Sequence, residues 1–515
     1  MKRFLYLTFT LTLLVFWSSC RNDFEFTPTT GHLEFSKDTV YLDTVFTNIG
    51  SSTYNLKVYN KSNKDILIPS IQLGLGSNSE YRLNVDGMSG NSFENVELLA
   101  KDSMYVFIET TIDIDNLPNL NNEFLYTDYI AFGEGADTQK VELVTLVKDA
   151  VFIYPDKDNT TGLIETLTLT IDGQPTETDI QGRYLESNEL NFTNQKPYVI
   201  YGYAAVPEGE TLTVDAGARI HFHANSGLIV SNNASLNVNG DLSTDQDLLE
   251  NEVVFEGDRL EPNFADVPGQ WGTIWLFDGS VNNTINHATI KNATVGILSD
   301  GNQNASNDKL TLTNSQIYNS SNFGLWGRAT SITAENVVIN NSGQSSFAGT
   351  LGGKYNLTHC TIANYWNNSF RQYPALLLNN FVIGEDAIVV NDLEAANINN
   401  CIIYGNNNPE LSIEKEDGTN FNFKFTNCLI RFDDSFGNFN QAEYDFENSN
   451  LYENCLFNQV PDFLDPQSNQ LIIGDASAAN NQANASYANQ VQYDILGVDR
   501  TTAPDIGAYQ HILFE

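Results

Sequence analysis

Short apolar runs separated by turn-forming residues fill the first third of the chain. Segments 48–52 and 74–78 are rich in Gly, Asn and Ser, and they lie between runs rich in β-branched and aromatic residues. These runs stand at 40–46, 56–59, 66–68, 105–108, 129–132 and 141–147. Short strands with regular turn signals are typical of an immunoglobulin-like β-sandwich. The pattern therefore predicts such a sandwich over residues 32–150.

A repeated six-residue unit replaces this pattern in the second half of the chain. Its eight copies begin at 285, 312, 334, 357, 378, 398, 425 and 452, and their fourth residues are 20 to 27 positions apart, a period typical of solenoids. Positions four and six are mostly apolar or small and follow the two-residue period of a strand, whereas positions one and four do not. Position three is Asn in six copies and His in two, residue types that readily adopt left-handed backbone. Each copy therefore predicts two strands joined by a bend, and no helical spacing accompanies it.

These copies resemble the coils of the right-handed parallel β-helix, the fold of the pectate-lyase-like superfamily. Three further resemblances concern flanking segments, and each rests on several short stretches of sequence. Residues 33–40, 45–51, 83–87 and 101–103 resemble an N-terminal domain of surface lipoproteins of Gram-negative bacteria. Residues 211–222, 226–230, 235–240 and 269–274 resemble the opening coils of bacterial β-helix lipoproteins. Residues 475–480, 494–500 and 505–509 resemble the end of β-helix proteins of the choice-of-anchor Q type, with Gln510 in place of the usual Glu.

The resemblances imply an all-β chain in which a right-handed parallel β-helix follows an immunoglobulin-like β-sandwich. We expect a linker and the start of a cap over 151–194 and the β-helix itself over 195–470. The C-terminal segment 471–515 is expected to cover the end of the stack, because an open end would expose unpaired backbone groups.

The first twenty residues have the pattern of an export signal. Lys2 and Arg3 precede an apolar run over 4–17, which ends at Ser-Ser-Cys. This run is shorter than the roughly 20 residues that span a bilayer, so it favours a signal peptide over a membrane helix.

Cys20, directly after the small residues, resembles the lipobox cysteine of bacterial lipoproteins, although Trp17 stands where Leu is usual. The resemblance implies removal of residues 1–19, lipidation of Cys20 and a polar tether over 20–31. It also implies lipid anchoring in the outer membrane, on the cell surface. The alternative is ordinary signal cleavage beside an incidental cysteine.

The charge of the chain excludes one class of partner. Lys and Arg number 25 against 65 Asp and Glu, a formal net charge of -40. An excess of carboxylates this large repels phosphate backbones and anionic lipid surfaces, so no nucleic-acid partner is expected.

Cysteines recur at position four of the repeated unit: Cys360, Cys401, Cys428 and Cys455. A zinc site is one interpretation, but the spacing typical of zinc ligands is absent. Side chains stacked in register point the same way, which does not suit a disulfide. The placement instead predicts a buried row of small side chains, since Ala288 and Ser315 fill the same position.

Residues with binding chemistry fall into two sets. Arg219, His221 and His223 alternate with apolar residues and so share the outward face of a strand, where they could bind a uronate carboxylate or take up a proton. An ordinary solvated strand face is the alternative. Aromatic residues that could stack on sugar rings, or else pack as core, are Trp271, Trp275, Trp326, Trp366, Tyr365 and Tyr373.

Calcium is the metal that the acidic turns would suit. Asp113 and Asp115, and likewise Asp156 and Asp158, place carboxylates at alternate positions, but neither pair has the Gly and distant Glu of a full calcium loop. Plain acidic turns are the alternative. No other cofactor is expected.

Three functions remain. The first is a noncatalytic, surface-anchored protein that binds or adheres to an extracellular polysaccharide, with Arg219, His221, His223, Trp271 and Trp275 as the candidate glycan site. The second, by analogy of fold, is a polysaccharide lyase or glycoside hydrolase, for which no set of base, acid and metal ligands can be aligned. The third is a structural component of the cell surface.

We expect the substitution Cys20→Ala to release the protein from membranes, because the acylated thiol is the expected anchor. Fractionation of cells into membrane and soluble material checks this. Sedimentation of the variant with membranes, as for the unaltered chain, would contradict lipid anchoring at this residue.

Overall fold

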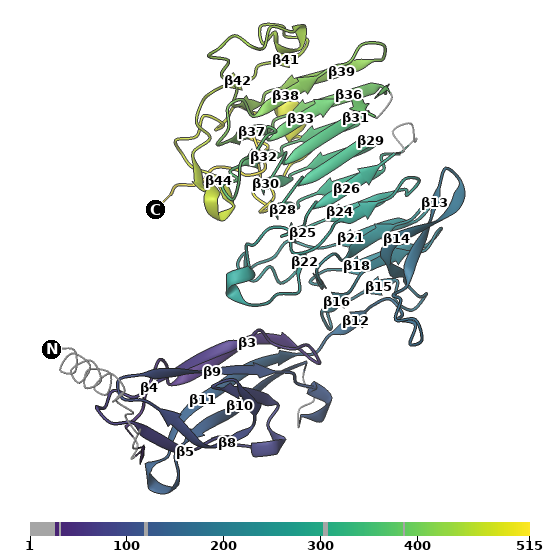
Figure 1. The fold of residues 1–515 in the computed structure, drawn as a ribbon. Coiled ribbons are helices and arrows are strands. Elements are labelled where there is room, and N and C mark those ends of the chain that lie inside the picture. The colour runs from purple at the N-terminus through teal and green to yellow at the C-terminus, as the bar shows by residue number, and fades with distance from the viewer. Residues whose placement is uncertain (1–25, 30–31, 118–121, 302–306, 385–386, 515) are drawn as a thin grey trace, which may run out of the picture. The chain divides into compact units, whose positions relative to one another are not determined.

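The computed structural model describes residues 26–29, 32–117, 122–301, 307–384 and 387–514, and the lipidation candidate Cys20 lies outside them. The chain divides into two compact units, 1–149 and 150–515. Both are built from strands, so the prediction of an all-β chain is confirmed (Figure 1). The one α-helix in the described ranges is α2 (Ala485–Ala488), and none of the helices there is long and apolar enough to cross a membrane.

Two sheets share one core in the first unit. The larger sheet has the order β1-β5-β10-β11-β3, with β8 paired to β5, and the smaller has the order β2-β4-β9-β6-β7. The strands of the larger sheet are β1 (Thr27–Pro28), β3 (Thr39–Phe46), β5 (Ile66–Leu73), β8 (Ser92–Leu98), β10 (Glu123–Phe132) and β11 (Gln139–Lys148). Those of the smaller sheet are β2 (Glu34–Phe35), β4 (Tyr54–Tyr59), β6 (Tyr81–Val85), β7 (Met88–Gly90) and β9 (Ser103–Thr110). Alternate residues of both sheets, such as Val40, Leu56 and Val106, are fully buried in the shared core.

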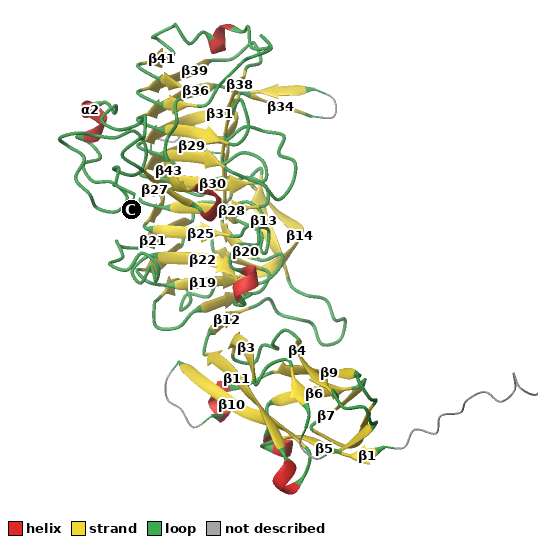
Figure 2. Ribbon diagram, turned by 90° about the vertical axis from the view of Figure 1, so that its left-hand side faces the viewer, coloured by secondary structure: helices red, strands yellow, loops and turns green. Residues whose placement is uncertain are grey.

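The second unit is a stack of parallel strands in two long sheets (Figures 1 and 2). The first sheet has 11 strands: β12 (Val151–Ile153), β16 (Tyr198–Ile200), β19 (Arg219–Phe222), β22 (Val253–Gly257), β25 (Ala288–Lys291), β28 (Gln316–Ser320), β30 (Val338–Ser342), β32 (Thr361–Asn364), β37 (Ile402–Gly405), β40 (Leu429–Ile430) and β42 (Leu456–Phe457).

The second sheet has 18 strands, which form two parallel rows joined by the long strands β29 and β31. They are β13 (Thr166–Ile171), β14 (Gln174–Tyr184), β15 (Asn191–Phe192), β17 (Tyr203–Val206), β18 (Thr211–Asp215), β20 (Gly227–Val230), β21 (Ser235–Asn239), β23 (Ile274–Leu276), β24 (Asn283–Asn286), β26 (Ile297–Asp300), β27 (Leu310–Thr313), β29 (Leu325–Glu335), β31 (Phe347–Thr358), β33 (Leu376–Asn379), β36 (Leu393–Asn399), β38 (Leu411–Glu414), β39 (Phe421–Thr426) and β41 (Tyr452–Glu453). Two hairpins stand apart: β34 (Phe381–Ile383) with β35 (Ile388–Val390), and β43 (Phe463–Asp465) with β44 (Gln470–Ile473).

The chain passes through three strand rows in a fixed cycle. After β25 of the 11-stranded sheet it forms β26 and then β27 of the 18-stranded sheet, and it returns to the first sheet as β28, next to β25. Each row points apolar side chains into one continuous core, as Ile290, Ile297 and Leu312 do. The core therefore lies inside the stack, between the three rows of strands.

A left-handed residue precedes each strand of the 11-stranded sheet from β25 onward, in seven of the eight repeated units. His287, Asn314, Asn336, His359, Asn400, Asn427 and Asn454 have φ between 44° and 54°. The predicted bend at position three is thus confirmed in seven of the eight copies. The copy at 378–383 is a wrong assignment, because Asn379 ends strand β33 and the residues after Asn380 form the β34–β35 hairpin. The chain inserts this hairpin between two bends, which obscures the period there.

The cysteines form the predicted buried row. Cys360, Cys401 and Cys428 are at most 1% exposed, and Cys455 at the end of the row is half-buried. The backbone N–H of Cys360 donates to Sγ of Cys401 at 3.3 Å. The N–H of Ala288, at the same position of another copy, donates to Oγ of Ser315 at 3.1 Å. The small polarisable or hydroxyl side chain therefore accepts a buried backbone hydrogen bond between coils, which an aliphatic residue could not do.

The C-terminal segment differs from its expected position. Instead of covering the end of the stack, it lies along the outer face of the 11-stranded sheet, where Ile495 and Tyr509 pack on Tyr318 and Val338. It also binds the bend residues, since Nη2 of Arg500 donates to Oδ1 of Asn336 at 2.9 Å.

The same segment contacts the later bends. Nδ1 of His359 lies 3.3 Å from the carbonyl oxygen of Gly507, and the side chain of Asn400 donates to the carbonyl oxygen of Asn484 at 3.1 Å. Gly507 has φ 103°, and a Cβ there would lie 2.8 Å from Ile402. The motif that resembles the choice-of-anchor Q type thus lies along the side of the stack and binds the bends of several coils.

Aromatic side chains gather around the last strands instead. Phe432, Phe439, Tyr444 and Phe446 lie within 4.8 to 6.4 Å of one another, measured between ring centroids. Phe446 also contacts the ring of Tyr452 on β41 at 4.8 Å. These rings shield the final strands from water.

We expect Cys401→Ala to lower the free energy of unfolding by about 1 to 2 kcal/mol, because buried volume and the acceptor of the Cys360 N–H are both lost. Cys455→Ala, at the half-buried end of the row, should cost less. Denaturant unfolding measures both, and stoichiometric zinc in the purified protein would contradict the buried-row interpretation.

Candidate functional site

Outward side chains of the 18-stranded sheet stand in two adjacent rows. The apolar row runs through Trp275, Leu298, Trp326, Ala348 and Leu377, which are register partners on successive strands. Two residues further along the same strands lies a polar row, in which Arg328 is the register partner of both Asp300 and Thr350, and Asn379 is that of Glu414. Parallel register therefore places aromatic and charged groups side by side.

A cavity of about 830 Å³ opens on these rows. Its aromatic lining comes from the strand residue Trp326 and from three connections: Phe323 before β29, Tyr373 before β33 and Phe381 at the start of β34. The β34–β35 hairpin projects from the stack beside it (Figure 2). Its charged lining consists of Asp278, Asp300, Arg328 and Glu414. We call this the aromatic cavity.

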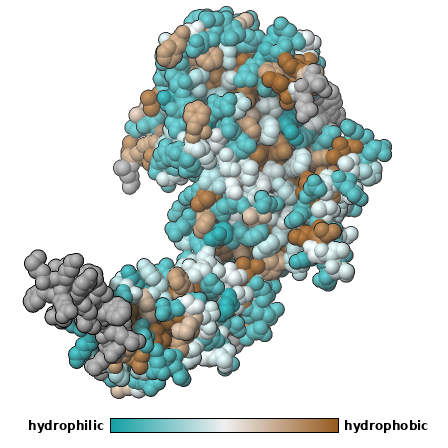
Figure 3. All heavy atoms as spheres, in the orientation of Figure 1, coloured by the Kyte–Doolittle hydropathy of each residue, from teal (hydrophilic) through white to brown (hydrophobic). Residues whose placement is uncertain are grey.

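A second cavity of about 620 Å³ shares Phe381 and Glu414 with the first. Its other charged residues are Lys415, Glu416, Asp417 and Glu443, and Phe439 and Tyr444 supply its aromatic rings. The two cavities together, called the acidic groove below, follow the flank of the stack. Figure 3 shows brown, hydrophobic patches scattered over a mostly teal surface of this unit.

Arg328 and Asp300 form the central ion pair of the aromatic cavity. Nε and Nη2 of Arg328 lie 2.5 Å from the two carboxylate oxygens of Asp300, and Nε1 of Trp275 donates to Oδ2 of Asp300 at 2.8 Å. The Arg328 guanidinium also lies 5.0 Å from the centroid of the Trp326 ring, whose other neighbour is Phe323 at 4.5 Å. This bidentate pair fixes the orientation of both side chains.

Lys309 supports the same region from inside the protein. It is 1% exposed, and its ammonium donates to the carbonyl oxygens of Phe277, at 2.7 Å, and of Asp300. These bonds hold the end of β26, which carries Asp300, and the residue before Asp278, just after β23. Burial lowers the pKa of Lys309 to about 7, against the opposing effect of the nearby carboxylates of Asp300 and Asp278.

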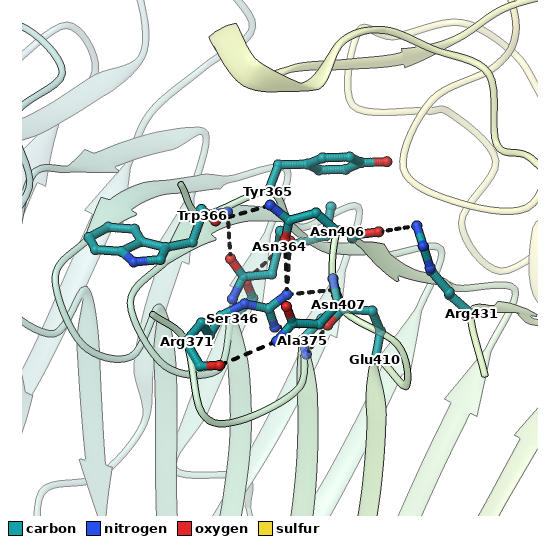
Figure 4. A network of polar contacts seen from close by, with 12 residues as sticks. Ser346, Asn364, Tyr365, Trp366, Arg371, Ala375, Asn406, Asn407, Glu410 and Arg431 are labelled. Atoms are coloured by element: carbon teal, nitrogen blue, oxygen red, sulfur yellow. Dashed lines mark hydrogen bonds and ion pairs between the residues drawn. The ribbon is translucent and has the colours of Figure 1, made fainter. Parts of the chain in front are cut away.

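Arg371 and Glu410 form a buried ion pair beside Ala375, in the connection between β32 and β33 (Figure 4). Arg371 and Glu410 are at most 2% exposed, and two guanidinium nitrogens lie 2.6 and 2.8 Å from the carboxylate oxygens. Arg371 also donates to the carbonyl oxygen of Tyr373 at 2.9 Å, and Glu410 accepts from the backbone N–H of Ala375 at 2.8 Å. The two charges thus compensate each other away from solvent, and Nε of Arg371 alone has no hydrogen-bond partner among the described residues. The Tyr373 backbone is tied to the neighbouring coil through Arg371.

Several residues predicted as a glycan site lie elsewhere. Arg219 donates to the backbone carbonyl oxygens of Leu249, at 2.6 Å, and Glu252, at 2.7 Å, so it holds a loop. His221 on the same strand is 6% exposed, and His223 is exposed and lies 2.7 Å from the carboxylate of Asp258. This strand, β19, belongs to the 11-stranded sheet, away from the rows that line the cavities.

The predicted tryptophans divide between the core and the rows. The prediction that Trp271 belongs to a glycan site is wrong. Trp271 is 1% exposed, and its ring stacks on Phe222 at 4.3 Å inside the core, where burial of its large apolar surface is favourable. Trp275 is half-buried and bonded to Asp300 next to the cavity. Trp366 is buried, whereas Trp326 and Tyr373 line the aromatic cavity.

The calcium candidates form turns. Asp113 accepts from the backbone N–H of Asp115 at 3.1 Å, at the start of a 3₁₀ turn, and Asp158 accepts from the N–H groups of Thr160 and Thr161. Among the residues that the structure describes, no group of three or more His, Cys, Asp or Glu is placed to hold a metal ion.

Sequence patterns did not single out Asp278, Asp300, Arg328 or Phe381 as site residues. Asp300 and Arg328 stand on strands that are distant in sequence, and only the strand register brings them together. Assigning the outward positions of each strand, rather than searching for short motifs, would have found Asp300 and Arg328 as neighbours.

We expect the stability of the protein to depend on the titration of Lys309. Its folded pKa, about 7, lies below the unfolded value near 10.4, so the unfolded state binds more protons between these values. The free energy of unfolding should therefore rise with pH from about 7 to 10, by up to about 1.4 kcal/mol per pH unit, relative to the variant Lys309→Met. Denaturant unfolding of both proteins across this range checks it, and parallel profiles would contradict it.

Comparisons with known proteins show no family for this chain. No family model matches it, and no curated protein matches it. It is similar to the catalytic domain of a GH87 alpha-1,3-glucanase in complex with tetrasaccharides, at 12% identity, over 73% of this chain and 81% of that chain, with a TM-score of 0.21. It is also similar to the E. coli chaperone DraB, at 15% identity, over 29% of this chain and 80% of that chain, with a TM-score of 0.17. TM-scores this low carry no argument about its fold or activity.

Proposed function

We propose that this chain is a lipid-anchored outer-membrane protein of the cell surface, and that its second unit is a right-handed parallel β-helix that binds an extracellular polysaccharide without cleaving it. The acidic groove is the proposed binding site. The observation that carries the proposal is the set of aromatic side chains, Phe323, Trp326, Tyr373 and Phe381, beside fixed polar groups in one cavity.

The fold part of the proposal is supported by the strand cycle. Three parallel rows around one core, with left-handed bends that recur in seven of the repeated units, are consistent with a β-helix. An immunoglobulin-like β-sandwich for the first unit is supported by its two sheets around one core.

Binding of a sugar polymer is supported by the chemistry of the groove. Aromatic rings pack on the apolar faces of sugars, and a few placed polar groups set orientation. Thr350, Asn379 and Arg328 offer such groups along the polar row. Because the rows repeat with each strand, spaced about 4.8 Å apart, they suit a ligand that is itself repetitive.

A noncatalytic role is supported by the state of Asp300. Both of its carboxylate oxygens are bonded by Arg328, and one also accepts from Trp275. Because both oxygens are already engaged by neighbouring side chains, neither is free to act on a bound sugar. Lipid anchoring rests on the resemblance of the segment around Cys20 to a lipobox.

Glycoside hydrolysis is the second candidate. Asp278 and Glu414 line the same cavity as Asp300, and paired carboxylates are the groups that most glycosidases use. Release of new reducing ends at an enzyme-like rate, abolished by Asp278→Asn, would favour this candidate over binding alone.

We expect detergent-solubilised full-length protein to retain a polysaccharide in an affinity screen against acidic, neutral and amino-sugar polymers. Trp326→Ala should weaken that binding about tenfold, or about 1.4 kcal/mol, since a ring that lines the cavity is lost. Tyr41→Ala, an exposed tyrosine of the first unit, is the matched control and should bind normally. Equal affinity of the Trp326 variant and the control would contradict the site.

A further inference from the structure

We infer that the acidic groove selects a positively charged glycan, a polymer of sugars that carry free amino groups. The inference rests on the proposed function and adds the class of ligand to it. It is drawn from the charges of the groove, the placement of its aromatic rings and the way the two cavities join.

The aromatic cavity has an excess of negative charge. Asp278, Asp300 and Glu414 line it, and Arg328 is its one cationic lining residue among those described. Because Arg328 is paired at 2.5 Å with Asp300, its charge is largely cancelled. Asp278 is exposed and Glu414 half-buried, so their charges face the ligand. Lys309 lies beneath this surface, fully buried behind Asp300.

The adjoining cavity repeats this imbalance. Its carboxylates are those of Glu414, Glu416, Asp417 and Glu443. Lys415, the cation among them, lies 3.7 Å from a carboxylate oxygen of Asp417 and 3.7 Å from one of Glu443. An anionic sugar would therefore meet repulsion in both cavities, since like charges at close range disfavour binding.

The aromatic rings favour a cation over a neutral ligand. Phe323, Trp326 and Phe381 stand in the same cavity as Asp278 and Glu414. An ammonium group is attracted both by the face of an aromatic ring and by a carboxylate, whereas a neutral hydroxyl donates a hydrogen bond to the carboxylate but lacks the cation–π attraction to the ring. An amino sugar meets both features, because its apolar face packs on a ring while its ammonium group binds a carboxylate.

The two lining residues that the cavities share favour a polymer over a single cation. Phe381 and Glu414 line both cavities, so one ring and one carboxylate are shared along the groove. Carboxylates on either side of this junction offer several successive sites for ammonium groups. A chain with a charge on each sugar would occupy them together, whereas a single small cation would use one.

The test compares two oligosaccharides of equal length, a β-linked glucosamine oligomer and its fully N-acetylated counterpart, by calorimetry on the detergent-solubilised full-length protein. We expect the free-amine oligomer to bind at least tenfold more tightly. Raising the salt concentration to about 0.5 M should reduce this preference, since the charges are partly exposed to solvent.

Two variants test the groups directly. Asp278→Asn and Glu414→Gln should each lower the preference several-fold, because each removes a charge that attracts an ammonium group and nearly keeps the shape of the side chain. Asp156→Asn, an exposed carboxylate outside the groove, is the control and should retain the full preference.

The outcomes separate this inference from the proposed function. Equal binding of both oligomers, still weakened by Trp326→Ala, would overturn the charge selection and leave glycan binding intact. A preference that survives both carboxylate variants would also overturn it, because the selection would then arise elsewhere. Failure of every polymer in the screen to bind would overturn both.

Discussion

The left-handed bend between strand rows is the constraint on which the second unit depends. An Asn or His at each bend turns the chain from the 18-stranded to the 11-stranded sheet, and stacked bends are linked through their side chains. Asn336 donates to Asn314 at 2.9 Å, and Asn400 lies 2.9 Å from Nε2 of His359. Burial lowers the pKa of His359 well below its ordinary value, so the ring stays neutral and serves as an amide does. Each bend fixes the phase of the next strand, and hence which residues face the core.

The site is a consequence of that phase. Once the strands are in register, residues two apart on one strand lie beside their partners on the next, which brings Asp300 against Arg328 and Leu298 against Trp326. The connections between rows carry no such restriction, because their ends alone are fixed by the stack. These connections vary in length. They supply Phe323, Tyr373 and Phe381, which form the walls of the aromatic cavity around the regular strand rows. The acidic groove thus combines strand residues, whose positions are set by register, with residues of the connections, whose positions are not.

The sequence predicted the regular part of this arrangement and missed the irregular part. Position three of each copy announced the bends, because Asn and His are the residues that adopt this backbone at low cost, and Cys401 and Cys428 stood at buried positions of the strands. The copy at 378–383 was wrongly assigned, because Asn380 is the residue type typical of a bend but does not have a positive φ. The local sequence could not show that Trp271 enters the core while Trp326 faces a cavity, since each is a tryptophan followed by glycine. Contacts between distant coils, such as Arg500 with Asn336, leave no local signal.

A buried ion pair in a wall of the site is costly, so its position needs a physical reason. Replacing Arg371 and Glu410 with apolar residues would save the desolvation of two charges, but it would leave backbone groups of the connection without partners. Glu410 accepts from the N–H groups of Asn407 and Ala375, and Arg371 donates to the carbonyl oxygens of Asn364 and Tyr373. No apolar pair could satisfy these groups, and a connection without them would have several arrangements of similar energy. The charge pair therefore fixes one path for the backbone that carries Tyr373. The position of this connection is then as well defined as that of the strands.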